Sequence, residues 1–373
     1  MSKKQEPARI LHVLGALDLG GAESRIMDLY RSIDKEKMQF DFMIHTTKEC
    51  YFNKEIRELG GNIYCVPCFR LYNYFSYKKA WKKFFEEHKG FRAVHGHMTS
   101  TAAIYLPVAK SGGVPITIAH ARSAGVDKGL KGKLTRFLRR NLAKCADLKI
   151  ACSQIAAESV FGKTAVDAGE VMIIPNAIDL ERFCFNKAKR EEMRNKFGIS
   201  DKWVIGHVGR FHYAKNHLYL IRIFSEIAKQ NEDAVLMLLG DGSERKNSEE
   251  LAEELGIREK VLFLGNQKNV SDYYQAMDYV VFPSRYEGLP GTIVEAQATG
   301  LRCIISDTIA KEVACTDLVS YESIEKEPRV WADVVIAGKE YERGSRIEEL
   351  RKKGFDVSGQ VSMYEEIYEM RSF

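Results

Sequence analysis

No stretch of this chain is apolar for long enough to cross a membrane. The longest apolar runs, such as Tyr279–Pro283 and Val334–Ala337, fall far short of the roughly 20 residues that a spanning helix needs. The first residues, Met1 to Arg9, are charged and are not followed by an apolar core of the signal-peptide type. Low-complexity tracts are also missing, while 45% of the residues are hydrophobic. These features predict a globular, cytoplasmic chain with enough apolar residues for two domain cores.

Cysteine is sparse and shows no complete metal-binding pattern. Eight cysteines are scattered over 373 residues, which favours a reducing cytoplasm over a disulfide framework. One pair, Cys65 and Cys68, is closely spaced, but a structural zinc site would require a second pair at a similar spacing. Because that second pair is missing, two ordinary cysteines at the end of a strand are the favoured interpretation.

Charge of one sign is not in large excess, but basic residues are concentrated in two segments. The formal net charge is +5, which is modest for this length. In residues 78–85 and 128–144, lysines and arginines alternate with apolar residues at the spacing of amphipathic helices. Two interpretations remain open: solvated helices packed on a core, or a peripheral face attracted to an anionic membrane. No nucleic-acid-binding motif accompanies these segments, so a nucleic-acid partner is not expected.

Two successive sets of strands and helices fill the chain. Their alternation predicts an α/β fold in which two Rossmann-like, doubly wound domains have a cleft between them. The expected domains are residues 1–185, residues 186–355, and a C-terminal helix at 356–373 that packs back on the first domain. The charged segment Asn176–Ile199 is the expected bridge. The predicted strands are Ile10–Leu14, Phe40–His45, Asn62–Val66, Ala93–His95, Ile116–His120, Leu148–Ala151, Val171–Ile174, Trp203–Gly209, Ala234–Leu239, Val261–Leu264, Tyr279–Phe282, Arg302–Ser306 and Leu318–Ser320.

The first predicted strand leads into a glycine-containing loop, Gly15-Ala-Leu-Asp-Leu-Gly20-Gly21-Ala-Glu23. A strand followed by a glycine turn and a helix start forms an anion site, because unpaired N–H groups and the helix dipole face the ligand. The loop lacks the spacing of the dinucleotide-binding fingerprint and the Lys-Ser/Thr pair of the phosphate loop of NTPases. A simple tight turn is the alternative.

Two basic residues follow the strand that opens the second set. In the sequence Gly206-His-Val-Gly209-Arg210-Phe-His-Tyr-Ala-Lys215, the strand delivers Arg210 and Lys215 into a loop that precedes a helix. A departing diphosphate gains negative charge as the glycosidic bond breaks, and two fixed cations would neutralise that charge. Solvated loop residues are the alternative interpretation if these two are taken alone.

A second loop of this set carries two glutamates, in Glu287-Gly-Leu-Pro-Gly291-Thr-Ile-Val-Glu295. Its small residues allow close approach of the backbone to a ligand, and a helix begins near Thr292, which again presents N–H groups to an anion. A carboxylate only accepts hydrogen bonds, so Glu295 suits the vicinal hydroxyls of a ribose. Glu287 lies at the far end of the loop, where a transferred sugar would lie.

Together these segments resemble glycosyltransferase family 4, whose members are retaining enzymes of the GT-B fold. The resemblance covers nearly the whole chain, and its most specific part is Pro283-Ser-Arg-Tyr-Glu287-Gly-Leu-Pro followed by Glu295-Ala. Within the family, the arrangement resembles enzymes that build bacterial exopolysaccharide and capsule repeat units. The other matching residues are Gly20-Gly21-Ala-Glu, His120, Val208-Gly-Arg210, Lys215, Gly240-Asp-Gly-Ser, and Tyr273-Tyr274 with Asp278.

The resemblance implies a role for each candidate residue. His120, at the end of a strand, would lie against the donor sugar and stabilise positive charge at the anomeric carbon; a buried core histidine is the alternative. The roles of His95 and His97 stay open. The implied catalytic residues are His120, Arg210, Lys215 and Glu287. The implied donor-binding residues are Gly20, Gly21, Gly209, Gly288, Leu289, Pro290, Gly291, Thr292 and Glu295.

The implied reaction is a retaining transfer from a nucleotide diphosphate donor, expected to be a UDP-sugar, to a saccharide or lipid-linked saccharide. No Asp-x-Asp motif occurs, so we expect no metal and no other cofactor, with cations and helix dipoles neutralising the leaving group. Domain closure would exclude water from the reaction. Two alternatives are a sugar-nucleotide epimerase of the same fold and a catalytically silent scaffold that binds a nucleotide sugar or lipid.

Overall fold

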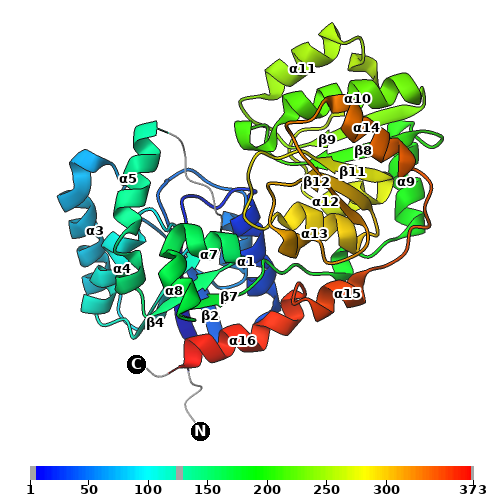
Figure 1. The fold of residues 1–373 in the computed structure, drawn as a ribbon. Coiled ribbons are helices and arrows are strands. Elements are labelled where there is room, and N and C mark those ends of the chain that lie inside the picture. The colour runs from blue at the N-terminus through cyan, green and yellow to red at the C-terminus, as the bar shows by residue number, and fades with distance from the viewer. Residues whose placement is uncertain (1–5, 123–128, 371–373) are drawn as a thin grey trace. The chain divides into compact units, whose positions relative to one another are not determined.

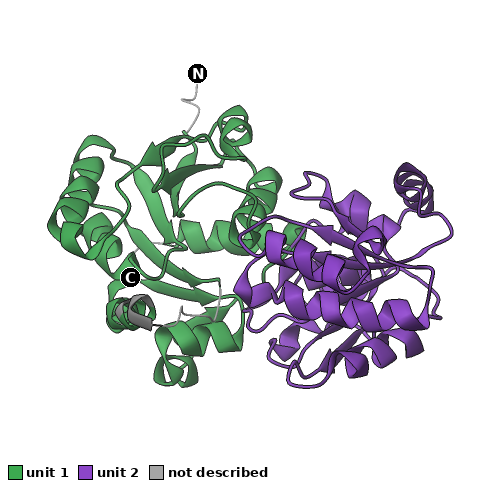
Figure 2. Ribbon diagram, turned by 90° about the horizontal axis from the view of Figure 1, so that it is seen from above, with its two compact units in different colours: residues 1–177, 357–373 green, residues 178–356 purple. Residues whose placement is uncertain are grey.

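The computed structural model describes residues 6–122 and 129–370, which form two compact units. Unit 1 contains the chain up to Ala177 and from Val357 onward, and unit 2 is Ile178–Asp356 (Figure 2). Each unit has its own parallel sheet and its own hydrophobic core. Among the helices in the described part of the chain, none combines the length and the apolar character needed to cross a bilayer.

Unit 1 is organised around a seven-stranded parallel sheet with the order β3-β2-β1-β4-β5-β6-β7. The chain starts in the middle of the sheet, extends it to one edge and then returns to build the other. The order therefore reverses between β1 and β4, and ligands of open α/β sheets bind outside the carboxyl ends of strands at such a point. The strands are β1 (Ala8–Val13), β2 (Met38–Ile44), β3 (Ile63–Cys65), β4 (Phe91–Gly96), β5 (Ile116–Ala121), β6 (Leu148–Ala151) and β7 (Val171–Ile173).

Helices connect these strands, and the sheet is buried between them. Every residue of β5 is buried, as expected for a parallel strand covered on both faces. Helices α3 and α4 pack against each other, with Trp81 and Phe85 of α3 fully or almost fully buried. The helices of unit 1 are α1 (Gly21–Ser32), α2 (Asn53–Glu58), η1 (Leu71–Asn73), α3 (Tyr74–Glu87), α4 (Ala102–Ser111), α5 (Gly129–Arg139), α6 (Leu142–Cys145), α7 (Gln154–Phe161), α8 (Lys163–Asp167) and α16 (Val357–Glu369). Lys128, which opens the second basic segment, lies outside the described residues.

The C-terminal helix α16 belongs to unit 1, although unit 2 precedes it in the sequence (Figures 1 and 2). It packs against α1, and its residues Tyr364, Ile367 and Tyr368 join the core of unit 1. Burying a large apolar side chain contributes roughly 1.5–3 kcal/mol, so these three residues anchor the helix. Arg92 of β4 donates hydrogen bonds to the carbonyls of residues 368–370, which have no partner within the helix because they belong to its last turn.

Unit 2 contains a six-stranded parallel sheet with the order β10-β9-β8-β11-β12-β13. Its order reverses between β8 and β11, so the two loops that the sequence analysis singled out, 209–216 and 283–290, follow neighbouring strands. The strands are β8 (Trp203–Val208), β9 (Ala234–Leu239), β10 (Val261–Phe263), β11 (Tyr279–Phe282), β12 (Arg302–Ser306) and β13 (Val319–Glu322). The predicted pair of parallel α/β sheets is thus confirmed, and each predicted strand coincides with an observed one.

The helices of unit 2 include most of the segment that the sequence analysis interpreted as a bridge. Helix α9 is held on unit 2 because Arg190 and Arg194 pair with Asp278, and Arg194 also donates to the carbonyl of Ala276. This part of the segment is therefore an integral element and not a connector. The helices are η2 (Glu181–Phe183), α9 (Lys187–Phe197), η3 (Tyr213–Lys215), α10 (His217–Gln230), α11 (Arg245–Glu254), η4 (Arg258–Lys260), α12 (Val270–Ala276), α13 (Gly291–Ala298), η5 (Lys311–Val313), α14 (Pro328–Ala337) and α15 (Ile347–Lys352).

Candidate active site

In unit 2, the loops after β8 and β11 are joined by hydrogen bonds. The backbone N–H of Arg285 donates to the carbonyl of Ala214 (2.7 Å), and its guanidinium donates to Oδ1 of Asn216 (2.8 Å). The side-chain amide of Asn216 donates in turn to the carbonyl of Pro283 (3.1 Å). Asn216 has a φ of 59°, in the left-handed region that asparagine tolerates better than most residues. These contacts hold the predicted basic loop and the predicted glutamate loop together.

Lys215 and Glu287, both predicted site residues, meet directly. Nζ of Lys215 lies 2.7 Å from Oε1 of Glu287, and each side chain is 19% exposed. The same ammonium group lies 4.6 Å from the centre of the Phe282 ring at the end of β11, which adds a cation–π contact. These two contacts hold the half-buried ammonium group of Lys215 in one position at the end of the β8 loop.

Glu295 lies on the inner face of α13, where its carboxylate is almost fully buried. The hydroxyl of Tyr274 lies 3.1 Å from Oε2 of Glu295 and 3.1 Å from the carbonyl of Thr292. Tyr274 therefore orients the carboxylate relative to the start of the helix. The helix begins after Pro290, which provides no side-chain cap, so the first N–H groups of α13 are suited to an anion.

Gly240 and Gly209 both lie in crowded positions, Gly240 against the backbone of Gly209 and Gly209 against two side chains. A Cβ atom on Gly240, whose φ is 127°, would lie 2.1 Å from the carbonyl oxygen of Gly209. A Cβ atom on Gly209 would lie 2.9 Å from Nε2 of His207 and 3.3 Å from Cδ of Lys215. The absence of side chains here thus leaves room for Lys215 beside the β8 loop.

Two buried histidines, His207 and His217, support this loop and were not predicted as part of the site. His217 stacks on Phe211 with ring centres 3.9 Å apart, and Nδ1 of His207 hydrogen-bonds to the carbonyl of Val281. Burial lowers the pKa of His207 to about 4 and that of His217 to about 2, so both rings are neutral near pH 7. Neither ring therefore adds a positive charge beside Lys215.

Arg210 is not brought into this cluster. Its side chain is exposed, and within residues 6–122 and 129–370 no side-chain hydrogen bond or ion pair of Arg210 occurs. Of the remaining donor-loop residues, Gly288, Leu289 and Pro290 are buried, whereas Gly291 and Thr292 are half-buried at the start of α13.

In unit 1, the predicted glycine loop leads into α1, whose N-cap is Gly20. The carboxylate of Glu23 turns back over this helix start. It comes so close to Gly20 that a Cβ atom on this residue would lie 2.2 Å from Oε2 of Glu23. Negative charge at the N-terminus of a helix is stabilising. The protein therefore supplies its own anion where the sequence analysis expected donor phosphate to bind near Gly20 and Gly21.

His120 belongs to a cluster of four histidines at the carboxyl ends of β1, β4 and β5. Nδ1 of His120 lies 2.9 Å from Nε2 of His95, and Nδ1 of His12 lies 3.0 Å from Nε2 of His97. His12, His95 and His120 are almost fully buried, and His97 is half-buried. His12 was not predicted, and its only signal in the sequence was a histidine inside an apolar strand. His95 and His97, whose roles the sequence left open, both belong to this cluster.

The cluster is electrically neutral near pH 7. Burial is the largest effect on all four rings; it lowers the pKa of His12 to about 3 and the pKa values of His95, His97 and His120 well below their ordinary value. The guanidinium of Arg122, whose Nε donates to Nδ1 of His97 at 3.3 Å, lowers these pKa values further. His12, His95 and His97 have ring nitrogens within 4.8 Å of one another, which is close enough to surround a metal ion. The adjacent positive charge of Arg122 disfavours a cation at that position.

Comparison with known proteins agrees with this fold. The family profile described as Glycosyltransferase Family 4 matches residues 19–182, and the profile of glycosyl transferases group 1 matches residues 189–317. Glycosyltransferase EpsF of Bacillus subtilis (strain 168) is 35% identical over 369 residues, which cover 96% of each chain. The chain therefore belongs to glycosyltransferase family 4, and it is a glycosyltransferase of the GT-B fold.

Two further relatives and one solved structure extend the comparison. The capsular polysaccharide biosynthesis glycosyltransferase CapH of Staphylococcus aureus is 24% identical over 96% of this chain and 98% of its own. The Escherichia coli UDP-Gal:alpha-D-GlcNAc-diphosphoundecaprenol alpha-1,3-galactosyltransferase is 29% identical over 57% of each chain. The crystal structure of Anabaena HepE in complex with UDP-glucose superposes with a TM-score of 0.76 at 17% identity, covering 96% of this chain and 99% of HepE.

Proposed function

We propose that this protein is a retaining glycosyltransferase that transfers the sugar of a UDP-sugar donor to a saccharide or lipid-linked saccharide during the assembly of bacterial exopolysaccharide or capsule. The observation that supports this best is the half-buried ion pair of Lys215 and Glu287. Glu287 lies four residues before Gly291, where α13 begins. The UDP-glucose complex of HepE supports a UDP donor. CapH supports a role in polysaccharide synthesis, and the Escherichia coli relative supports a lipid-linked acceptor.

In the proposed reaction, the bond between the anomeric carbon and the diphosphate oxygen breaks, and UDP leaves. The acceptor hydroxyl oxygen bonds to the anomeric carbon from the same face, and its proton passes to the departing phosphate. Lys215 and the N–H groups at the start of α13 stabilise the charge that develops on the diphosphate. Glu287 holds the transferred sugar, and Glu295, oriented by Tyr274, accepts hydrogen bonds from the ribose.

The proposed reaction uses neither a metal ion nor another cofactor. A metal ion at a diphosphate would supply positive charge, and Lys215, Arg210 and the dipole of α13 supply it instead. EDTA treatment followed by assay in metal-free buffer is the direct test, and loss of activity that Mg²⁺ or Mn²⁺ restores would contradict the proposal.

A panel of UDP-sugars tests the function itself. We expect one of them to raise the melting temperature of the protein and to release UDP slowly by hydrolysis, and faster when diphosphoundecaprenol-linked saccharides are added. NMR of the product would show the same anomeric configuration as the donor. Binding of a UDP-sugar without release of UDP under any condition would instead indicate a silent binding scaffold, and an altered sugar still attached to UDP would indicate an epimerase.

Arg210 is expected to act mainly during turnover. Because its guanidinium is exposed and no described residue pairs or hydrogen-bonds with it, its charge is not held in place before the substrate binds. Changing Arg210→Ala should lower kcat by roughly 10–100-fold and change KM for the donor by less than about 3-fold, as expected for charge stabilisation that develops in the transition state. Arg222→Ala is the control. A rise in KM with an unchanged kcat would assign Arg210 to ground-state binding.

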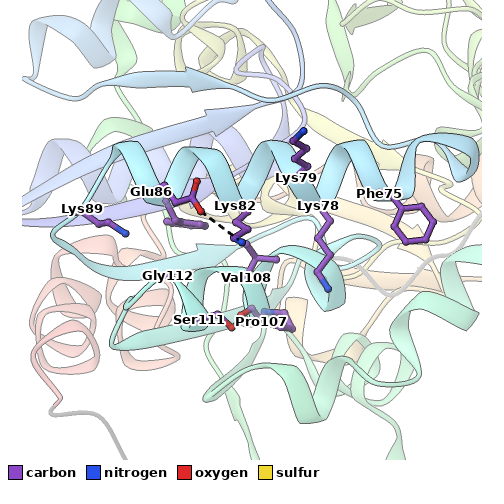
Figure 3. Close-up of a pocket in the computed structure, with 11 residues that line it drawn as sticks. Phe75, Lys78, Lys79, Lys82, Glu86, Lys89, Pro107, Val108, Ser111 and Gly112 are labelled. Atoms are coloured by element: carbon purple, nitrogen blue, oxygen red, sulfur yellow. Dashed lines mark hydrogen bonds and ion pairs between the residues drawn. The ribbon is translucent and has the colours of Figure 1, made fainter.

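We also propose peripheral contact with an anionic membrane through unit 1. A cavity of about 520 Å³ lies between α3 and α4, with apolar walls that include Phe85, Pro107 and Val108. Figure 3 shows Lys78 and Lys82 extending from α3 toward α4, and Lys79 and Lys89 also line the cavity. Glu86, 3.8 Å from Lys82, is the only acidic residue among the described residues of this lining. The exposed rings of Tyr72 and Phe75 lie at the adjacent end of α3, so positive charge and apolar surface occur together, as in membrane-contacting helices.

Vesicle sedimentation tests this contact. Since each lysine near an anionic surface contributes about 1 kcal/mol, changing Lys78, Lys79 and Lys82 together to alanine should weaken binding to phosphatidylglycerol vesicles by roughly 100-fold. Alanine at Lys187, Lys229 and Lys246, which are exposed lysines of unit 2, is the matched control and should leave binding unchanged. If the wild-type protein does not sediment with these vesicles even at low salt, the membrane contact is wrong.

A further inference from the structure

The four histidines of unit 1 form two separate hydrogen-bonded chains, each of which begins at a non-histidine residue. One chain runs from Nε of Arg122 to Nδ1 of His97 (3.3 Å), and from Nε2 of His97 to Nδ1 of His12 (3.0 Å). The other runs from the hydroxyl of Tyr368 to Nδ1 of His95 (2.6 Å), and from Nε2 of His95 to Nδ1 of His120 (2.9 Å). Both chains use the same ring atoms in the same order, and both end at a buried Nε2 atom.

The direction of the Arg122 chain follows from the chemistry of arginine. A guanidinium only donates hydrogen bonds, so Nδ1 of His97 must be the acceptor. A neutral His97 then carries its proton on Nε2, donates it to Nδ1 of His12, and leaves His12 protonated on Nε2. The lone pairs of His97 and His12 are both occupied by hydrogen bonds, which is a second reason why this cluster does not suit a metal ion.

The Tyr368 chain has two possible directions, because a phenol both donates and accepts. Tyr368 is fully buried on α16 among the rings of His12, Phe40 and Tyr364, and in the described part of the chain His95 is the one hydrogen-bond partner of its hydroxyl. A phenol O–H is a stronger donor than the N–H of a neutral imidazole, and an imidazole nitrogen is a stronger acceptor than a phenol oxygen, so the 2.6 Å contact favours Tyr368 as the donor. If it donates, the proton without a partner is moved to the other end of the chain, on Nε2 of His120, which is buried and has no partner.

We propose that Tyr368 and His95 are positioning residues that hold the proton of His120 on Nε2, so that this ring of unit 1 offers a hydrogen-bond donor, and not a base, to an oxygen of the substrate. The unmet donor then lies on the residue that the family resemblance assigns to the sugar. This inference rests on the proposed transferase function for its ligand, but the tautomer itself does not. It also leaves the departing phosphate as the base for the acceptor hydroxyl.

Neutrality of the cluster is consistent with this direction. The charged and titratable groups that face His120 and His95 are Arg122, His12, His97, Tyr364 and Tyr368. None of them supplies a negative charge near pH 7, because burial raises the pKa values of Tyr364 and Tyr368 above the ordinary value of a tyrosine. A second proton on His120 would therefore have no counter-charge, and the ring keeps a single proton whose position the chain decides.

The tautomer can be measured directly on the full-length protein with ¹⁵N-labelled histidine. Long-range ¹H–¹⁵N correlation spectra distinguish a protonated from an unprotonated ring nitrogen, and His120→Gln assigns the resonances of His120. We expect wild-type His120 to be protonated on Nε2. In Tyr368→Phe, which removes only the hydroxyl, we expect both tautomers to be populated. Tyr364→Phe is the matched control, since this neighbouring tyrosine is equally buried and should leave the tautomer unchanged. Protonation of wild-type His120 on Nδ1 would overturn the proposal.

Kinetics provide the second readout. Tyr368→Phe should lower kcat by about 10-fold, which corresponds to about 1.4 kcal/mol, with a smaller change in KM. His95→Gln should retain more activity than His95→Leu, because a glutamine amide can accept from Tyr368 and donate to His120. A Tyr368→Phe variant with unchanged tautomer and unchanged kcat would contradict the relay. If no UDP-sugar is turned over by the wild type, the proposed function fails, while the NMR result still decides the tautomer.

Discussion

Changing Lys215→Ala is expected to lower kcat/KM for the sugar donor by at least about 100-fold. Lys215 is the half-buried cation of the site, held 2.7 Å from Glu287 and placed over the ring of Phe282. Its charge is therefore fixed in position before the ligand arrives, and removal of a single preorganised electrostatic group typically costs 10²–10³ in rate. Steady-state release of UDP, measured against donor concentration, gives the effect.

Two controls separate this effect from a loss of structure. Lys229→Ala removes an exposed lysine that pairs with Glu226 on α10, and it should leave kcat/KM within a factor of about 2. The double variant, Lys215→Ala with Glu287→Ala, removes both partners of the ion pair. If its melting temperature is closer to that of the wild type than the melting temperature of Lys215→Ala is, the difference between the two variants shows how much the unpaired Glu287 destabilises the fold. If Lys215→Ala is as active as Lys229→Ala, the diphosphate does not bind at this position.

Changing Glu295→Ala is expected to weaken binding of UDP by about 100-fold, with a similar loss for UDP-sugars. The buried carboxylate accepts a hydrogen bond from Tyr274 and lies on the inner face of α13, close to the helix start. Hydrogen bonds to charged groups contribute about 1.5–3 kcal/mol each, and two of them to a ribose diol account for a loss of this size. Isothermal titration calorimetry with UDP measures it, and uridine without phosphate shows whether the loss belongs to the ribose.

The structure offers a matched control for Glu295. Tyr274→Phe keeps the carboxylate but removes the hydroxyl that orients it, and we expect a loss of only about 5-fold. Tyr274 also donates to the carbonyl of Thr292, so it stays anchored in Glu295→Ala, and the melting temperature of that variant should change little. Equal binding of UDP by the wild type and Glu295→Ala would place the ribose elsewhere.

The strands and the main site loops could be predicted from local sequence. Strands such as Ile116–His120 and Tyr279–Phe282 are short apolar runs bounded by polar residues or glycine, and parallel strands buried on both faces have that composition. Lys215 and Glu287 were predicted because each follows such a strand. That the two side chains form an ion pair could not be predicted, because their strands become neighbours only through the order β8-β11 of the folded sheet.

Other features were hidden because they depend on contacts between distant parts of the chain. Glu23 covers the helix start at Gly20 through the rotamer of one side chain, which no spacing reveals. The segment around Arg190 and Arg194 looked like a charged connector, since the sequence does not show that Asp278 is their partner. His207 and His217 looked like ordinary residues next to a loop, although their neutral rings meet edge to face and support it.

The sequence by itself determined the fold class, the family and the chemical types present in the loops, because apolar periodicity and turn residues act over a few neighbouring positions. Only the tertiary structure decided which of those groups interact. His12, His95 and His120 come from three strands separated by many residues, and Tyr368 comes from a helix near the end of the chain. Whether a hydrogen bond forms between them depends on distances of about 3 Å, and such distances are set by how the sheet orders its strands and where α16 packs, not by any local pattern.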